Sequence, residues 1–138
     1  MLKILATAAL TAAMLAGPAV AQTPRGAAVV SGQLDAASSE MGLTPGARVT
    51  GRLADGRTQL ANIQAPGGEI YFLGVCDENC RDVDMIVRDA SGREVGRDME
   101  PDDVPIVLVQ AVAGVYTVEV SMADCTGDCH WGVGVFRP

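Results

Sequence analysis

The residues with the clearest chemical potential are four cysteines and one histidine. The cysteines form two C-x3-C pairs, Cys76 with Cys80 and Cys125 with Cys129, and His130 follows the last of them. Even numbers of closely spaced cysteines are typical of disulfides in exported proteins. Crossed bridges between the pairs would stabilise the fold by about 4 kcal/mol, against about 2 for local ones. We nevertheless favour local bonds, 76–80 and 125–129, because crossed bridges require the two loops to adjoin within about 7 Å between Cα atoms.

Two other chemistries also use clustered cysteines. Four thiolates together with His130 would supply a tetrahedral zinc site. Zinc ribbons prefer C-x2-C spacing, however, and free thiolates are exposed to oxidation outside the cytoplasm. A thioredoxin-like centre requires C-x2-C in a βαβ context, and this sequence has neither feature. We therefore expect structural disulfides.

Catalysis through a histidine would have to use His130, the only one in the chain. The sequence has no G-x-S-x-G motif to supply a nucleophile, and the cysteines are expected to be oxidised. Paired carboxylates could serve a glycosidase, but one Trp, two Tyr and two Phe offer little platform for a sugar. We expect a protein that is not an enzyme, and keep a small hydrolase using His130 as the third alternative.

Acidic residues concentrate around the first cysteine pair and again before residue 105. Carboxylates gathered on loops are the ligands that calcium requires. If segments 76–84 and 98–103 meet at one end of the fold, a calcium site could form from Asp77, Asp82, Asp84, Asp98, Asp102 and Asp103. The opposing interpretation is solvated turns whose carboxylates pair with Arg81 and Arg97, since no EF-hand or nonapeptide calcium spacing is present. We expect no cofactor other than this candidate calcium ion.

The elements that must position these residues are short strands. From residue 47 onward, apolar and polar residues alternate in runs separated by Gly, Pro, Asn or Asp, which is typical of a sandwich or barrel. Tyr116, Val118 and Val120 share one face of a strand, and Trp131 begins the inner face of the last one. We predict eight strands, at 47–53, 58–64, 69–76, 83–89, 93–97, 105–110, 115–122 and 130–137.

The N-terminal region differs in composition from the rest. Residues 1–21 have a basic start, a short apolar run and an A-x-A site, which predicts a signal peptide cleaved before Gln22. A lipoprotein needs a cysteine directly after the cleavage point, and the nearest one is Cys76, so we expect no membrane anchor and a periplasmic or secreted location. Residues 22–46 are predicted to be a loose segment, with at most a short helix between Asp35 and Gly42. The formal charge of −7 disfavours a nucleic-acid partner.

The order of motifs resembles a known family. Asp82-x-Asp84 followed by a turn at Gly92, then Gly114-x-Tyr116-x-Val118, and finally Trp131-x-Val133 is similar to the bacterial pre-peptidase C-terminal domain. The resemblance covers residues 47–138 and implies an all-β sandwich of about eight antiparallel strands with jelly-roll-like topology. Such domains usually follow secreted proteases, and some relatives bind calcium or extracellular polymers. The two C-x3-C loops depart from the usual pattern.

These observations favour an exported, non-catalytic binding or accessory module whose ligand the sequence does not identify. The partner would be an extracytoplasmic protein or polymer. The alternative is a calcium-dependent binder of an envelope polymer or of a partner protein.

Overall fold

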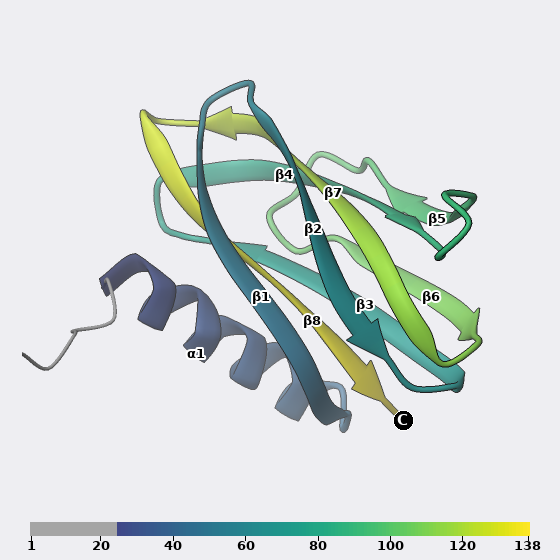
Figure 1. Cartoon of the computed structure of the whole chain (residues 1–138). Helices are drawn as coiled ribbons and strands as arrows, with labels where there is room; N and C mark the ends of the chain where they lie inside the picture. The colour runs from purple at the N-terminus through teal and green to yellow at the C-terminus, as the bar shows by residue number, and fades with distance from the viewer. Residues whose placement is uncertain (1–24) are drawn as a thin grey trace, which may run out of the picture.

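The computed structural model describes residues 25–138, so the predicted signal peptide, 1–21, lies outside the described residues. One helix precedes eight strands (Figure 1). The elements are α1 (Arg25–Glu40), β1 (Thr44–Ala54), β2 (Thr58–Ala65), β3 (Gly68–Cys76), β4 (Cys80–Arg88), β5 (Glu94–Asp98), β6 (Ile106–Ala111), β7 (Gly114–Cys125) and β8 (Asp128–Arg137). No helix in this part of the chain is long and apolar enough to cross a membrane.

The strands form two four-stranded antiparallel sheets. One has the order β1-β8-β3-β6 and the other β2-β7-β4-β5. The first strand pairs with the last, the second with the seventh, the third with the sixth and the fourth with the fifth. This nested pairing is that of one long hairpin rolled into a double sheet, which is a jelly roll. The predicted fold class is therefore confirmed.

The main core lies between the two sheets. On β7 the side chains of Tyr116, Val118, Val120 and Met122 are buried, whereas the intervening residues are partly exposed. This is the two-residue period of a strand with one buried face, as the sequence predicted. Trp131 of β8 is fully buried in the same core.

The helix corrects our prediction of a loose segment over 22–46. Residues 25–40 form α1, which packs against β8, β1 and β3 on the outer face of their sheet. Val30 and Leu34, one turn apart, are fully buried there with Phe136. A Cβ atom on Gly132 would lie only 3.3 Å from Leu34 Cδ1, so this glycine permits the close approach of helix and strand. Burial against the sheet thus compensates for a weak intrinsic helical pattern.

The end of the helix was predicted correctly, but its beginning was not. Gly42 has a φ of 68°, and its N–H donates to Ser39 O while Leu43 N–H donates to Ser38 O. These bonds form a Schellman motif, which satisfies the last carbonyls of α1. Asp35 does not cap the helix: it lies inside it and pairs with Arg48 of β1 at 2.8 Å.

Candidate functional site

Four loops gather at one end of the sandwich, and we call this the four-loop end. Figure 1 shows three of the turns together, where β1 meets β2, β3 meets β4 and β7 meets β8. The fourth loop joins β5 to β6 and approaches the others, because Val83 N–H donates to Asp102 O at 3.0 Å. The loops comprise residues 55–57, 77–79, 99–105 and 126–127.

Two disulfides hold this end together. Cys76 bonds Cys80, and Cys125 bonds Cys129, with Cα–Cα distances of 5.8 and 6.1 Å. These are the local bonds that we favoured. The two loops that the disulfides close lie side by side, since Thr126 N–H donates to Asn79 O at 2.9 Å. The loops thus adjoin as crossed bridges would require, and Cys80 and Cys125 are register partners on β4 and β7.

Asp77 and His130 form a buried polar contact between two of these segments. The Asp77 carboxylate accepts a hydrogen bond from Asn79 N–H at 3.1 Å and one from His130 N–H at 2.8 Å. The imidazole Nδ1 lies 3.4 Å from Asp77 Oδ2, and Gly26 of α1 packs against the ring. The carboxylate thus anchors the loop after β3 to the beginning of β8. It is committed to this contact rather than to the acidic cluster.

The Asp77–His130 pair resembles two members of a catalytic triad, but no described residue that lines the adjacent pocket supplies the third. A pocket of about 320 Å³ opens beside the imidazole, and the charged side chains around it include Arg25, Arg52 and Asp128. Among the described residues that line it there is no serine, threonine or free thiol. A nucleophile within hydrogen-bond reach of the base is what a triad mechanism requires. The described lining of this pocket therefore supplies no nucleophile for such a mechanism.

A separate acidic cluster lies beside the four-loop end. Asp82 and Asp84 project from β4, close to Asp98 at the end of β5 and to Asp102 in the loop that follows. Burial raises the pKa of both β4 carboxyls, and the neighbouring negative charges raise it further, although hydrogen bonding with Asp84 acts to lower the pKa of Asp82. The two Oδ1 atoms of Asp82 and Asp84 are buried and accept no hydrogen bond from the described residues. These carboxylates thus repel one another in a partly desolvated place.

The structure places four of the six predicted calcium ligands near one another, but without the grouping that a metal ion requires, and separates the other two. Asp77 contacts His130 instead, and Asp103 faces α1. Asp98 and Asp102 each accept a backbone hydrogen bond at 2.9 Å, from Ile106 and Val104. Within residues 25–138, no three His, Cys, Asp or Glu side chains are grouped so that they could hold a metal ion.

The expected arginine partners do not neutralise this cluster. Arg81 pairs with Asp124 at 2.7 Å, and Arg97 pairs with Glu94. In the described part of the chain, none of the four clustered carboxylates has an ion pair. Sequence proximity suggested the wrong partners because the strand register, which aligns β4 with β7, selects Asp124 for Arg81.

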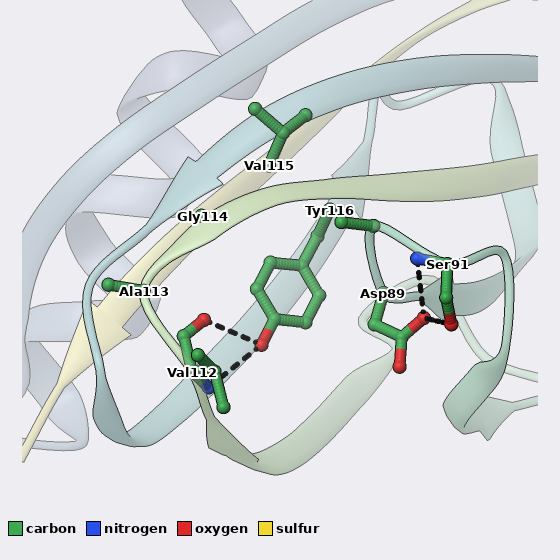
Figure 2. A pocket seen from close by; sticks show the side chains of 8 residues that line it. Asp89, Ser91, Val112, Ala113, Gly114, Val115 and Tyr116 are labelled. Carbon is green, nitrogen blue, oxygen red and sulfur yellow. Dashed lines mark hydrogen bonds between the residues drawn. The ribbon is translucent and has the colours of Figure 1, made fainter.

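The opposite end of the sandwich has a pocket of about 220 Å³ with little polar surface (Figure 2). The Tyr116 hydroxyl donates to Val112 O at 2.9 Å and accepts from Val112 N–H at 3.1 Å. On the other side, Asp89 accepts hydrogen bonds from the backbone and hydroxyl of Ser91, at 3.0 and 2.6 Å. Each polar group stabilises a turn, so this pocket offers no chemistry beyond packing.

Sequence reasoning missed several residues that shape the four-loop end. Asp55 accepts a hydrogen bond from Cys125 N–H at 2.9 Å and joins the β1–β2 turn to the second disulfide. Arg52 pairs with Asp128 across β1 and β8 at 3.0 Å. The only available signal was the position of these residues at strand ends, which does not reveal which loops meet.

Comparison with known proteins supports the fold. No family model matches the sequence, and no curated protein matches it. Among solved structures, the chain is similar to the pre-peptidase C-terminal domain of a collagenase from Bacillus anthracis, with a TM-score of 0.50 and 16% identity. The similarity covers 64% of this chain and 87% of that domain. The resemblance expected from the strand motifs is thus confirmed, and the matched part of this chain has the fold of a bacterial pre-peptidase C-terminal domain.

Proposed function

We propose that this protein is an exported, non-catalytic binding or accessory module that acts in the periplasm or outside the cell. The observation that carries the proposal is the four-loop end, where two disulfides fix neighbouring loops. Loops that are rigid before binding lose less entropy when a partner docks, so they favour affinity. Disulfides also persist only in oxidising compartments, which supports an extracytoplasmic location.

The charge of the four-loop end suggests the chemistry of its partner. Glu78 and Glu100 are exposed on two of its loops, and neither forms an ion pair with a described residue. A surface with this excess of carboxylates attracts basic groups and speeds their association. We therefore expect an extracytoplasmic protein or polymer with cationic groups at the contact.

Charge reversal tests this proposal. The immobilised, oxidised protein is exposed to an extracytoplasmic protein extract and to a cationic polymer, chitosan, and retained material is quantified. Glu78→Arg combined with Glu100→Arg should abolish retention, whereas Glu69→Arg at the other end of the sandwich should leave it unchanged. Equal retention by the doubly reversed variant would contradict the proposal. His130→Ala should also retain the ligand, and loss of a hydrolytic activity in that variant would instead support the hydrolase alternative.

A calcium-dependent binder is the second candidate. It is favoured by the Oδ1 atoms of Asp82 and Asp84, which are buried without partners, and by the lack of neutralising arginines around them. Because the carboxylates do not form a ready metal site, calcium would have to draw Asp98 or Asp102 closer to β4.

Thermal unfolding in EDTA and then in millimolar calcium tests the second candidate. Calcium at 100 times its dissociation constant adds about 2.7 kcal/mol to the free energy of unfolding, which should raise the Tm by several degrees. Asp84→Asn should remove that increase, while Glu78→Gln should preserve it. If the wild-type Tm is the same in both buffers, the calcium-dependent binder is excluded.

A further inference from the structure

A groove lies between α1 and the loop that joins β5 to β6. Its volume is about 220 Å³, and its floor includes Ala36, Ala37, Val75 and Val104. The helix covers β8, β1 and β3 but leaves the outer face of β6 uncovered. The groove therefore opens onto a part of the sheet that nothing in the described chain occupies.

The charged side chains of the groove are both carboxylates. Glu40 and Asp103 both line it and are exposed, and neither forms an ion pair with a described residue. The Gln33 Oε1 atom, also from the lining, is buried and accepts no hydrogen bond within residues 25–138. An occupant that complements this set must donate hydrogen bonds and carry positive charge. Lysine and arginine meet both requirements, and their aliphatic stems suit an apolar floor.

An apolar strip extends from the groove along β6. Ile106 and Leu108 are 39% and 51% exposed. Their register partners on β3, Leu73 and Tyr71, belong to the cluster that α1 covers. Ile106 and Leu108, together with Val104, place an apolar side chain at every second residue over about 13 Å. This spacing matches that of alternate side chains on an extended segment.

We propose that the groove and the strip together bind an extended segment of a partner protein. This segment contains a Lys or Arg, and apolar residues lie two and four positions away from it. The basic side chain enters the groove between Glu40 and Asp103, and the apolar side chains cover Ile106 and Leu108. The surface goes beyond the proposed function, because it lies over the outer face of the β1-β8-β3-β6 sheet and does not use Glu78 or Glu100, although Cys76 and the loop that joins β5 to β6 contribute to its lining.

A defined peptide tests the proposal whichever way the segment runs. The probe is fluorescein-labelled Gly-Val-Thr-Val-Thr-Arg-Thr-Val-Thr-Val-Gly, which has apolar residues on both sides of its central arginine. Its binding to the wild-type protein is measured by fluorescence anisotropy at low salt. One control peptide has Glu in place of Arg, and a second has Thr in place of every Val. We expect saturable binding of the probe and about tenfold weaker binding of each control, the effect of about 1.4 kcal/mol.

Protein variants assign the contact to the groove. Glu40→Gln with Asp103→Asn should weaken probe binding about tenfold, and Leu108→Thr should weaken it about fivefold. Glu94→Gln, on β5 of the other sheet, should leave the affinity unchanged, because it belongs neither to the groove nor to the four-loop end. Circular dichroism and the Tm establish that each variant is folded.

Three results would overturn the proposal. The first is no saturable binding up to millimolar probe, and the second is equal binding of the Arg and Glu peptides. The third is a wild-type dimer in sedimentation velocity that Leu108→Thr converts to monomer, which would assign the strip to a second copy of this chain.

Discussion

Cys80 of β4 and Cys125 of β7 are register partners on neighbouring strands, although each forms its disulfide within its own loop. The two disulfides therefore constrain adjacent loops at the same end of the sandwich. Since Thr126 N–H donates to Asn79 O, the loop that one bond closes is hydrogen-bonded to the loop that the other closes. The rigidity of the four-loop end arises from this adjacency as well as from the bonds themselves.

Removal of one bond should cost stability that can be measured directly. For Cys76→Ala with Cys80→Ala we expect the free energy of unfolding to fall by about 2 kcal/mol, because a short closed loop restricts the unfolded chain only modestly. Urea denaturation of the oxidised protein measures the change. A loss below about 0.5 kcal/mol would show that the loop is held by its hydrogen bonds alone.

The adjacency of the loops also predicts that the two disulfides are coupled. Removing both bonds should change the free energy of unfolding by an amount that differs from the sum of the two single removals by about 0.5 kcal/mol or more, as expected for neighbouring sites. A double-mutant cycle with Cys125→Ala and Cys129→Ala measures this difference. Strict additivity would mean that the loops act independently.

The strands could be predicted because each carries its own period. Phe72 lies in the core between the sheets while Tyr71, the preceding residue, contacts the cluster beneath α1. Opposite faces for adjacent residues follow from strand geometry alone. The jelly-roll order was predicted through resemblance to a family, since periodicity does not determine which strands pair.

The helix and the site could not be predicted in the same way. The apolar face of α1 is narrow, with Val30 and Leu34 as its fully buried large side chains. The segment is helical because that face packs against strands such as β8 and β3, which are distant in sequence. The acidic residues likewise separate according to the topology: Asp82 and Asp84 project from one sheet, whereas Asp103 faces the helix on the other.

Two substitutions within one turn of α1, one at a buried and one at an exposed position, test its packing. Leu34→Ala should lower the free energy of unfolding by about 2–5 kcal/mol, because it opens a cavity in a fully buried cluster. Gly32→Ala should raise it by about 0.5–1 kcal/mol, since Gly32 is exposed in mid-helix and a Cβ there meets nothing within 4 Å. Urea denaturation measures both. Equal effects of the two changes would contradict the observed packing of α1.

Tyr116 tests the turn between β6 and β7. Tyr116→Phe keeps the buried ring but removes the hydroxyl that bridges Val112 N–H and Val112 O. The free energy of unfolding should fall by about 1–2 kcal/mol, because a part-buried donor and acceptor lose their partner. Tyr71→Phe is the control, and it should change stability by less than about 0.5 kcal/mol. Similar losses in both variants would show that the cost does not depend on the bridge to Val112.

The acidic cluster predicts a pH dependence of a particular sign. Burial and neighbouring carboxylates raise the folded-state pKa of Asp84 above its ordinary value of 3.8. Between the two pKa values the folded protein binds more protons than the unfolded chain, so this group's contribution to stability is favourable at low pH and is lost as the pH rises. At pH 7 the ionised carboxylate is therefore destabilising.

Asp84→Asn should thus stabilise the protein at pH 7 by about 0.5 kcal/mol, the size of a partly exposed charge interaction, and the gain should vanish below about pH 4. Glu94→Gln should change the free energy of unfolding in the opposite direction. The ion pair with Arg97 lowers the pKa of Glu94, so the wild-type carboxylate stabilises the protein at pH 7. That contribution disappears as the pH falls. Urea denaturation at pH 7, 5 and 3.5 in EDTA, which excludes calcium, measures both variants. If Asp84→Asn is destabilising at pH 7, the cluster is held together by an attraction rather than strained by repulsion, and the carboxylates on β4 would have to be reassigned as structural partners.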